Sequence, residues 1–161
     1  MTAPTSPAAA GRYVRAVLWD MDGTLMDSQP IWDESFLRRC RERGGTVTPE
    51  QVAGIAGASI ARTRELIAAT GATPSPQDPA TAEVFAQMAA DVEASVRVTP
   101  PILPGARRIT SMLSEIGLAQ VIVTQSPRRI VESVAHALGD VFVGLITGDD
   151  GLPGKPTPAP Y

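Results

Sequence analysis

The chain has 161 residues, with 14 Lys and Arg against 17 Asp and Glu, a net charge of −3, and 43% hydrophobic residues. That length fits one compact domain with a small insertion. The acidic balance and the lack of a basic run argue against a surface for nucleic acid or anionic membrane, because such surfaces work by neutralising phosphates.

Cysteine and lysine each occur once, so their positions are informative. A single Cys40 excludes an intramolecular disulfide framework and a cysteine-built zinc site, and we expect a small buried residue in a reducing compartment. Lys155 is the only lysine beside thirteen arginines. No apolar run approaches the ~20 residues of a membrane span. The first ten residues lack the apolar core of a signal peptide, so we expect a cytoplasmic protein.

The N-terminal part predicts a lead-in followed by a strand. Residues 1–10 are small and rich in Pro and Ala, which is typical of a disordered segment. Residues 13–19 form a short apolar run that predicts a strand buried on both faces. This run leads into Asp20-Met21-Asp22-Gly23-Thr24-Leu25, where Gly23 ends the strand.

Four helical segments follow with almost no strand signal, at residues 30–43, 49–56, 59–70 and 78–96. In the first segment, which Asp27 or Ser28 caps, the apolar residues Trp32, Phe36 and Cys40 recur every four residues. In the last segment, Phe85, Met88, Val92 and Val96 share one face. We interpret residues 28–99 as a helical insert.

The C-terminal part alternates helices and strands. After Pro104-Gly105 a helix carries an apolar face of Ile109, Met112, Leu113 and Ile116. A strand at 118–124, a helix that Ser126 and Pro127 begin, and a strand at 141–147 come next. This alternation predicts an α/β fold with a parallel sheet, built from residues 11–27 and 100–161.

Chemically suggestive residues fall at or soon after the strand ends. Asp20 and Asp22 follow the first strand, Thr124 ends the second, and Lys155 comes after the third. Open parallel sheets bind ligands at the carboxyl ends of their strands. Ser126 also heads a helix, whose free N–H groups favour an anion. The pattern predicts a site for a metal and a phosphate.

These motifs resemble those of the haloacid dehalogenase-like phosphohydrolase superfamily. Asp20-Met-Asp22-Gly-Thr-Leu resembles its first motif, Thr124-Gln-Ser126 its second, and Gly154-Lys155-Pro156 its third. The segment 27–32 resembles the hinge into a helical cap in the subgroup of β-phosphoglucomutase and phosphoglycolate phosphatase. The resemblance implies a Rossmann-like core with an α-helical cap at residues 28–99.

The resemblance also implies a role for each carboxylate. Asp20 would attack phosphorus and form an aspartyl-phosphate, and Asp22 would protonate the leaving alcohol and then activate water. Mg²⁺ would be held by the Asp20 carboxylate and the Asp22 backbone carbonyl. Thr124 and Lys155 complete the implied catalytic set, because Lys155 would offset charge in the transition state. The implied phosphate-binding residues are Thr124, Gln125, Ser126 and Lys155.

One motif of the family is missing from the sequence. The family has a fourth motif, an acidic pair after a further strand beyond the lysine, and the sequence stops before it. We therefore expect a chain truncated at its C-terminus with an incomplete core, or a degenerate relative. Without that strand, residues 14–19 would form an exposed apolar edge, and we expect self-association there.

The expected function is magnesium-dependent hydrolysis of a small phosphorylated metabolite, impaired in the truncated chain. A phosphosugar mutase of the β-phosphoglucomutase type shares every visible motif and stays an alternative. A non-catalytic truncated remnant is the other alternative, favoured by the missing acidic motif. The cap residues around 57–59 would set the substrate.

Several other residues have plainer interpretations. Arginines on the helices are more typical of solvated faces than of phosphate contacts. A histidine deep in a helix is structural, and an acidic pair before Gly151 is a turn. These residues are Arg62, Arg64, Arg128, Arg129, His136, Asp149 and Asp150.

Overall fold

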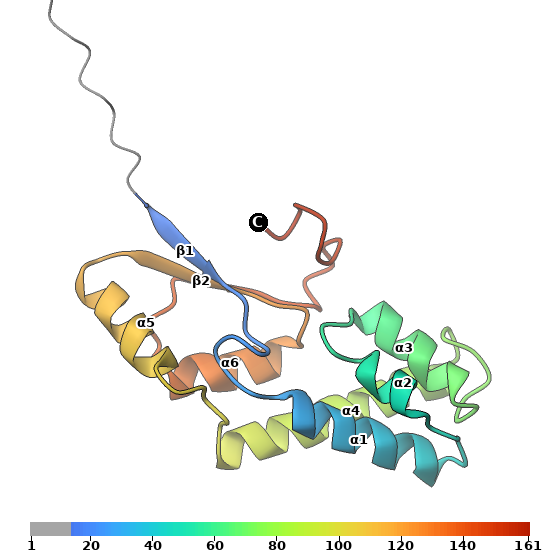
Figure 1. Cartoon of the computed structure of the whole chain (residues 1–161). Coiled ribbons are helices and arrows are strands. Elements are labelled where there is room, and N and C mark those ends of the chain that lie inside the picture. Colours follow the sequence, from blue (N-terminus) through green and yellow to red (C-terminus); the bar gives the residue numbers. More distant parts are fainter. Residues whose placement is uncertain (1–13) are drawn as a thin grey trace, which may run out of the picture.

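The computed structural model describes residues 14–161, so the lead-in at residues 1–10 and Tyr13 lie outside the described part. Three strands form one parallel sheet in the order β1-β2-β3 (Figure 1). They are β1 (Ala16–Trp19), β2 (Ala119–Val123) and β3 (Gly144–Ile146). The predicted α/β fold with a parallel sheet is confirmed.

Four helices come between β1 and the other two strands along the chain, and they lie beside one another (Figure 1). Helix α1 packs on α4, and α3 packs on the same helix. The side chains of Thr48, Ser59 and Asp78 cap α2, α3 and α4, which explains why these helices begin where they do. Their bounds are α1 (Gln29–Glu42), α2 (Pro49–Ala53), α3 (Ile60–Ala69) and α4 (Pro79–Val98).

Helices α5 (Ala106–Glu115) and α6 (Arg128–Ala137) lie on the same side of the sheet (Figure 1). Gln120 of β2 is fully buried under them and joins the layers. Its side-chain oxygen accepts from Trp19 Nε1 at 3.0 Å, and its amide donates to the Thr110 carbonyl at 2.9 Å. No helix of the described part is long and apolar enough to cross a membrane.

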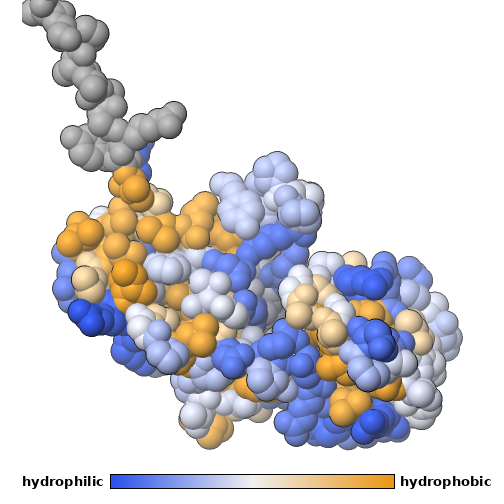
Figure 2. Space-filling view, in the orientation of Figure 1, coloured by the Kyte–Doolittle hydropathy of each residue, from blue (hydrophilic) through white to orange (hydrophobic). Residues whose placement is uncertain are grey.

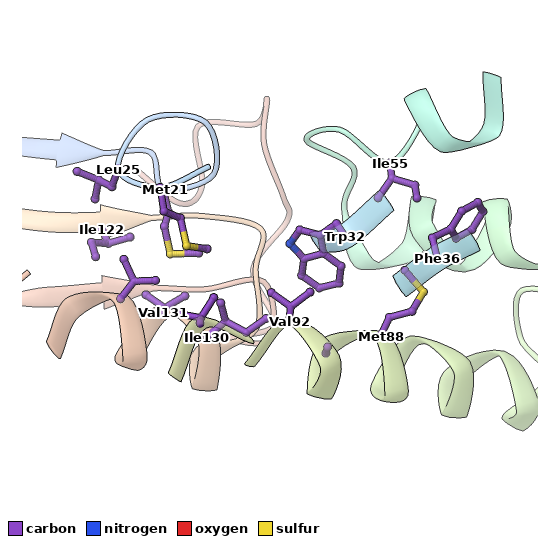
Figure 3. Close-up of a cluster of buried hydrophobic side chains, with 14 of the residues drawn as sticks. Met21, Leu25, Trp32, Phe36, Ile55, Met88, Val92, Ile122, Ile130 and Val131 are labelled. Atoms are coloured by element: carbon purple, nitrogen blue, oxygen red, sulfur yellow. The ribbon is translucent and has the colours of Figure 1, made fainter. Parts of the chain in front are cut away.

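One hydrophobic core extends from the sheet into the helices α1–α4 (Figure 3). Met21, Leu25 and Ile122 pack against α6 at the sheet end. Trp32 and Phe36 of α1 lie on the helical side, and the predicted stripe of Trp32, Phe36 and Cys40 is buried. The continuous core holds the loops after the strands at a defined position relative to α1–α4.

The expectation that the first strand is buried on both faces was wrong. The first strand is not buried on both faces, because α5 and α6 cover only one side of the sheet and Leu18 stays 45% exposed. The apolar face of α5 is also largely exposed, with Ile109 at 41%, Met112 at 48% and Ile116 at 75%. Helix α5 instead turns Ala106 and Thr110 inward, where the Gln120 amide is bonded. Figure 2 shows hydrophobic surface gathered over the part of the molecule with β1 and α5.

Candidate active site

The four residues predicted to carry chemistry meet at the carboxyl ends of the strands. Asp20 and Asp22 follow β1, Thr124 follows β2, and Lys155 lies in the segment after β3. Hydrogen bonds join Lys155 to Asp20 and Thr124 to Asp22, although more than 100 residues separate each pair in sequence. The parallel sheet places these residues together because all its strands end at the same edge.

Asp20 holds an ion pair in a half-exposed position. Lys155 Nζ lies 2.5 Å from Asp20 Oδ1, and the Thr24 hydroxyl donates to Oδ2 at 3.2 Å. The Asp20 side chain is 45% exposed, whereas that of Lys155 is 21% exposed. A carboxylate in this position is accessible to a ligand, and the ammonium beside it places positive charge where an anion would approach.

Asp22 is surrounded by hydroxyl groups. Ser28 and Ser126 donate to its two carboxylate oxygens, the latter at 2.7 Å, and Thr124 donates to Oδ2 at 3.0 Å. The three donors come from the start of α1 and from the loop between β2 and α6. They hold the carboxylate in one orientation, since each bond fixes an oxygen from a different direction.

A tight turn after β1 sets the spacing of the two carboxylates. Gly23 has φ +81°, a conformation that glycine adopts without the strain of a Cβ. The Met21 carbonyl accepts from the N–H groups of Leu25 and Met26 at 2.8 and 3.2 Å. Leu25 and Met26 are fully buried, so the turn is anchored in the core.

The segment that carries Lys155 reaches the site because two glycines pack against Gln125. A Cβ on Gly148 would lie 2.0 Å from the Gln125 carbonyl oxygen, and one on Gly154 would lie 2.6 Å from Gln125 Oε1. The Gln125 amide donates to the Lys155 carbonyl at 3.2 Å. Gln125, predicted to bind phosphate, therefore also supports Lys155 from the neighbouring loop.

A cleft opens beside Asp22, between the sheet loops and the helices α1–α4. We call it the cap cleft. Aromatic and aliphatic side chains form most of its walls, and polar groups, of which Asp22 is the single ionisable one, complete them. Its lining residues are Asp22, Gln29, Trp32, Ile55, Gly57, Ala58, Ile60, Thr63, Phe85, Gln125, Ser126 and Pro127.

Two oxygen atoms in the site suit a hard divalent cation. The Asp20 carboxylate is half-exposed, and within residues 14–161 the Asp22 backbone carbonyl accepts no hydrogen bond. Mg²⁺ prefers such oxygen ligands and keeps several waters, so the donor chemistry fits it. The described residues contain no group of three or more His, Cys, Asp or Glu side chains that could hold a metal. Protein ligands within this part are thus fewer than the six positions of the ion.

Sequence reasoning missed the position of Ser28 and misread that of Ser126. Asp27 or Ser28 was expected to cap α1, and Ser28 does occupy the N-cap position, but its side chain makes no cap hydrogen bond. Ser126 was expected to cap α6, which has Pro127 at its N-cap instead. Both serine hydroxyls donate to the carboxylate of Asp22 instead. The only sequence signal was a serine six residues after Asp22.

The other candidates lie outside the carboxylate site, and all but Arg64, whose buried Nε has no hydrogen-bond partner within the described residues, make ion pairs or hydrogen bonds. Arg62 pairs with Glu65, Arg129 with Glu93, and the exposed His136 with Asp140. Arg128 pairs with Asp150 at 2.6 Å, and this hydrogen bond lowers the pKa of Asp150. Asp149 accepts hydrogen bonds from the Arg128 N–H and from the Thr147 hydroxyl. Cys40 is buried as expected, and burial raises the pKa of its thiol.

A family model described as haloacid dehalogenase-like hydrolase matches residues 14–161. Hexitol phosphatase B of Escherichia coli K12 is 29% identical over 163 aligned residues, which cover 93% of this chain and 68% of that protein. Phosphoglycolate phosphatase of Pseudomonas fluorescens Pf0-1 is also 29% identical, over 92% of this chain and 56% of its own length. The chain thus spans about two thirds of the first relative and just over half of the second.

Solved structures show the same fold. β-Phosphoglucomutase of Clostridium difficile superposes with a TM-score of 0.74 at 16% identity, over 91% of this chain and 67% of that one. A phosphoglycolate phosphatase structure from Lactobacillus plantarum has a TM-score of 0.70 at 23% identity, with 91% and 68% covered. Both coverages place the shared fold over the sheet and the helices α1–α4 together.

Proposed function

The chain belongs to the haloacid dehalogenase-like hydrolase family, and from that premise we propose that it hydrolyses the phosphate monoester of a small molecule through Asp20. The observation that carries this proposal is the pairing of Asp20 with Lys155 at the end of β1, with Asp22 two residues away. A carboxylate nucleophile, a neighbouring ammonium and a second carboxyl group are the parts that two-step phosphoryl transfer needs.

In the first step, an Asp20 carboxylate oxygen forms a bond to phosphorus while the bond from phosphorus to the alcohol oxygen breaks. The Asp22 carboxyl, in its protonated form, gives its proton to that oxygen, and the alcohol leaves. Lys155, already 2.5 Å from Asp20, balances the negative charge that accumulates on the phosphoryl oxygens. The product of this step is an aspartyl-phosphate.

In the second step, water attacks the aspartyl-phosphate and Asp22 accepts its proton. Phosphate is released and both carboxyl groups return to their starting protonation. Ser28, Thr124 and Ser126 keep the Asp22 carboxylate in place between the steps. The Thr124 hydroxyl would also donate to a phosphoryl oxygen, whereas the first N–H of α6, that of Arg128, is already bonded to Asp149.

Mg²⁺ fits the Asp20 carboxylate and the Asp22 backbone carbonyl, as the donor set indicates. When bound, the ion would supply further positive charge for the phosphoryl oxygens. We also propose that α1–α4 act as a cap, because they form the wall of the cap cleft opposite the sheet loops. The substrate's alcohol part would then lie in that cleft.

The test replaces Asp20 with asparagine in the protein and measures p-nitrophenyl phosphate hydrolysis in millimolar Mg²⁺. We expect Asp20→Asn to lower kcat by about 10³-fold or more, because an amide cannot serve as the nucleophile. Asp27→Asn, an exposed carboxylate in the same loop, should keep normal turnover. Near-normal turnover by Asp20→Asn, or none by the unaltered protein, would contradict the proposal.

A further inference from the structure

We infer that the cap cleft selects phosphate esters whose alcohol part is uncharged, and that a second anionic group on the substrate is rejected. This inference rests on the proposed function and concerns the substrate class of the same site. The accepted substrates would be monophosphates with a neutral hydroxylated or aliphatic alcohol part. Phosphorylated acids and bisphosphates would be rejected.

The lining of the cap cleft carries the inference. Trp32, Ile55, Ile60 and Phe85 form its apolar walls, and none of the described residues that line it is Lys, Arg or His. The rings of Trp32 and Phe85 stack with centroids 6.3 Å apart and planes 18° apart, which gives a flat apolar surface. The single ionisable side chain in the lining is Asp22, whose charge is negative when ionised.

Three cations near the cleft are already engaged, whereas Arg64 of α3 makes no ion pair within the described residues but is not part of the lining. Lys155 pairs with Asp20, where the reacting phosphoryl group needs it. The guanidinium of Arg62 at the start of α3 pairs with Glu65 at 2.7 Å, and that of Arg128 at the start of α6 pairs with Asp150 at 2.6 Å. A second anion in the cleft would therefore find no free counter-charge on its lining.

Charge burial without a partner is unfavourable. A carboxylate or second phosphate moved from water onto the Trp32 and Phe85 surface would lose hydration without gaining an ion pair. Hydroxyl groups would meet no such penalty, because Gln29, Thr63 and Gln125 supply neutral hydrogen-bonding groups.

The first experiment compares two esters that differ in one group. 2-Hydroxyethyl phosphate ends in CH₂OH where 2-phosphoglycolate ends in a carboxylate, so size is nearly constant and charge changes. We expect kcat/KM to be about tenfold or more higher for the neutral ester. Equal or faster hydrolysis of 2-phosphoglycolate would overturn the inference.

The second experiment adds a cation to the cleft. In Ile60→Lys the aliphatic stem can replace the isoleucine contacts and the ammonium can meet an anion. This change should raise kcat/KM for 2-phosphoglycolate relative to 2-hydroxyethyl phosphate by about tenfold. Ala69→Lys places the same charge at the exposed far end of α3 and should leave the ratio unchanged.

The results separate failure of this inference from failure of the proposed function. Turnover of p-nitrophenyl phosphate with no preference between the two esters would overturn the inference and leave the proposed function in place. No turnover of any ester by the unaltered protein would overturn both. If Ile60→Lys lost its circular dichroism signal, Ala58→Lys, also on the lining, would replace it. An unchanged ratio in a folded variant would contradict the inference.

Discussion

Lys155 brings a positive charge into the site through its contact with Asp20. Lys155 Nζ lies 2.5 Å from Asp20 Oδ1, and the lysine side chain is mostly buried. In a chain with thirteen arginines, the single lysine occupies this position. An ammonium is a compact charge, whereas a guanidinium is wide and planar, so the two differ in a confined site.

We therefore expect Lys155→Arg to lower kcat by about 10²-fold, the effect typical of removing one group that stabilises the transition state. The measurement is steady-state hydrolysis of p-nitrophenyl phosphate. Arg108→Lys, the reverse exchange on the exposed side of α5, should have no effect. An arginine variant as fast as the parent would show that only net charge matters at this position.

The Ser28 hydroxyl is a positioning group for Asp22. Ser28 is 1% exposed and donates to one Asp22 oxygen, while Thr124 and Ser126 donate to the other. Ser28→Ala should lower kcat by about tenfold and leave KM nearly unchanged, because Ser28 acts on Asp22 and does not line the cap cleft. The matched control is Ser133→Ala on α6, whose hydroxyl bonds the Arg129 carbonyl. An equal change in KM would indicate a binding role instead.

Among the helices, an ionic cluster joins α1 to α4. Asp91 of α4 accepts from Ser35 at 2.5 Å and from two nitrogens of Arg39 at 2.9 and 2.6 Å, and Arg38 lies 2.7 Å away. Burial alone would raise the pKa of Asp91. The hydrogen bonds from Arg39 and Ser35 outweigh it and bring the pKa from its usual 3.8 to about 2.

That shift predicts how stability depends on pH. Since the pKa of Asp91 is lower in the folded protein, its contribution is present above about pH 4 and is lost as pH falls through about 2. Asp91→Asn should reduce the free energy of unfolding by about 2 kcal/mol at pH 7 and by much less near pH 2. Urea unfolding at both pH values measures this. Glu34→Gln on the exposed side of α1 should show no such dependence.

On the scale of the whole molecule, one face of the sheet carries no helix within residues 14–161. Leu18 and Val121 are register partners on the face opposite Gln120, and β1 is an edge strand. Figure 2 shows hydrophobic surface around β1 and α5. Exposed apolar edges of this kind are association sites in β proteins.

We expect a polypeptide of residues 1–161 to associate, and Leu18→Lys to shift it toward monomer, because an edge lysine opposes strand pairing. Light scattering at several concentrations measures the average mass. Val98→Lys provides the control, since Val98 is 84% exposed at the end of α4, away from the sheet. A monomeric parent, or equal effects of the two variants, would contradict association through β1.

The sequence by itself determined the elements and the order of the site loops. Helices α1, α3 and α4 follow local apolar spacing and caps such as Ser59 and Asp78, which act within one turn of the chain. Asp20, Asp22, Thr124 and Lys155 could be placed at one edge because parallel strands share it. Both inferences use only the local pattern of each segment and the order of the segments along the chain.

Only the tertiary structure decided which partner each group takes. The Ser28 hydroxyl could accept from a nearby N–H or donate to the Asp22 carboxylate. The packed turn after β1 brings that carboxylate within reach. Helix α5 could bury either its isoleucines or Ala106 and Thr110, and the bond from Gln120 accompanies the second choice. Such competitions depend on distances between segments far apart in the chain, which local pattern does not contain.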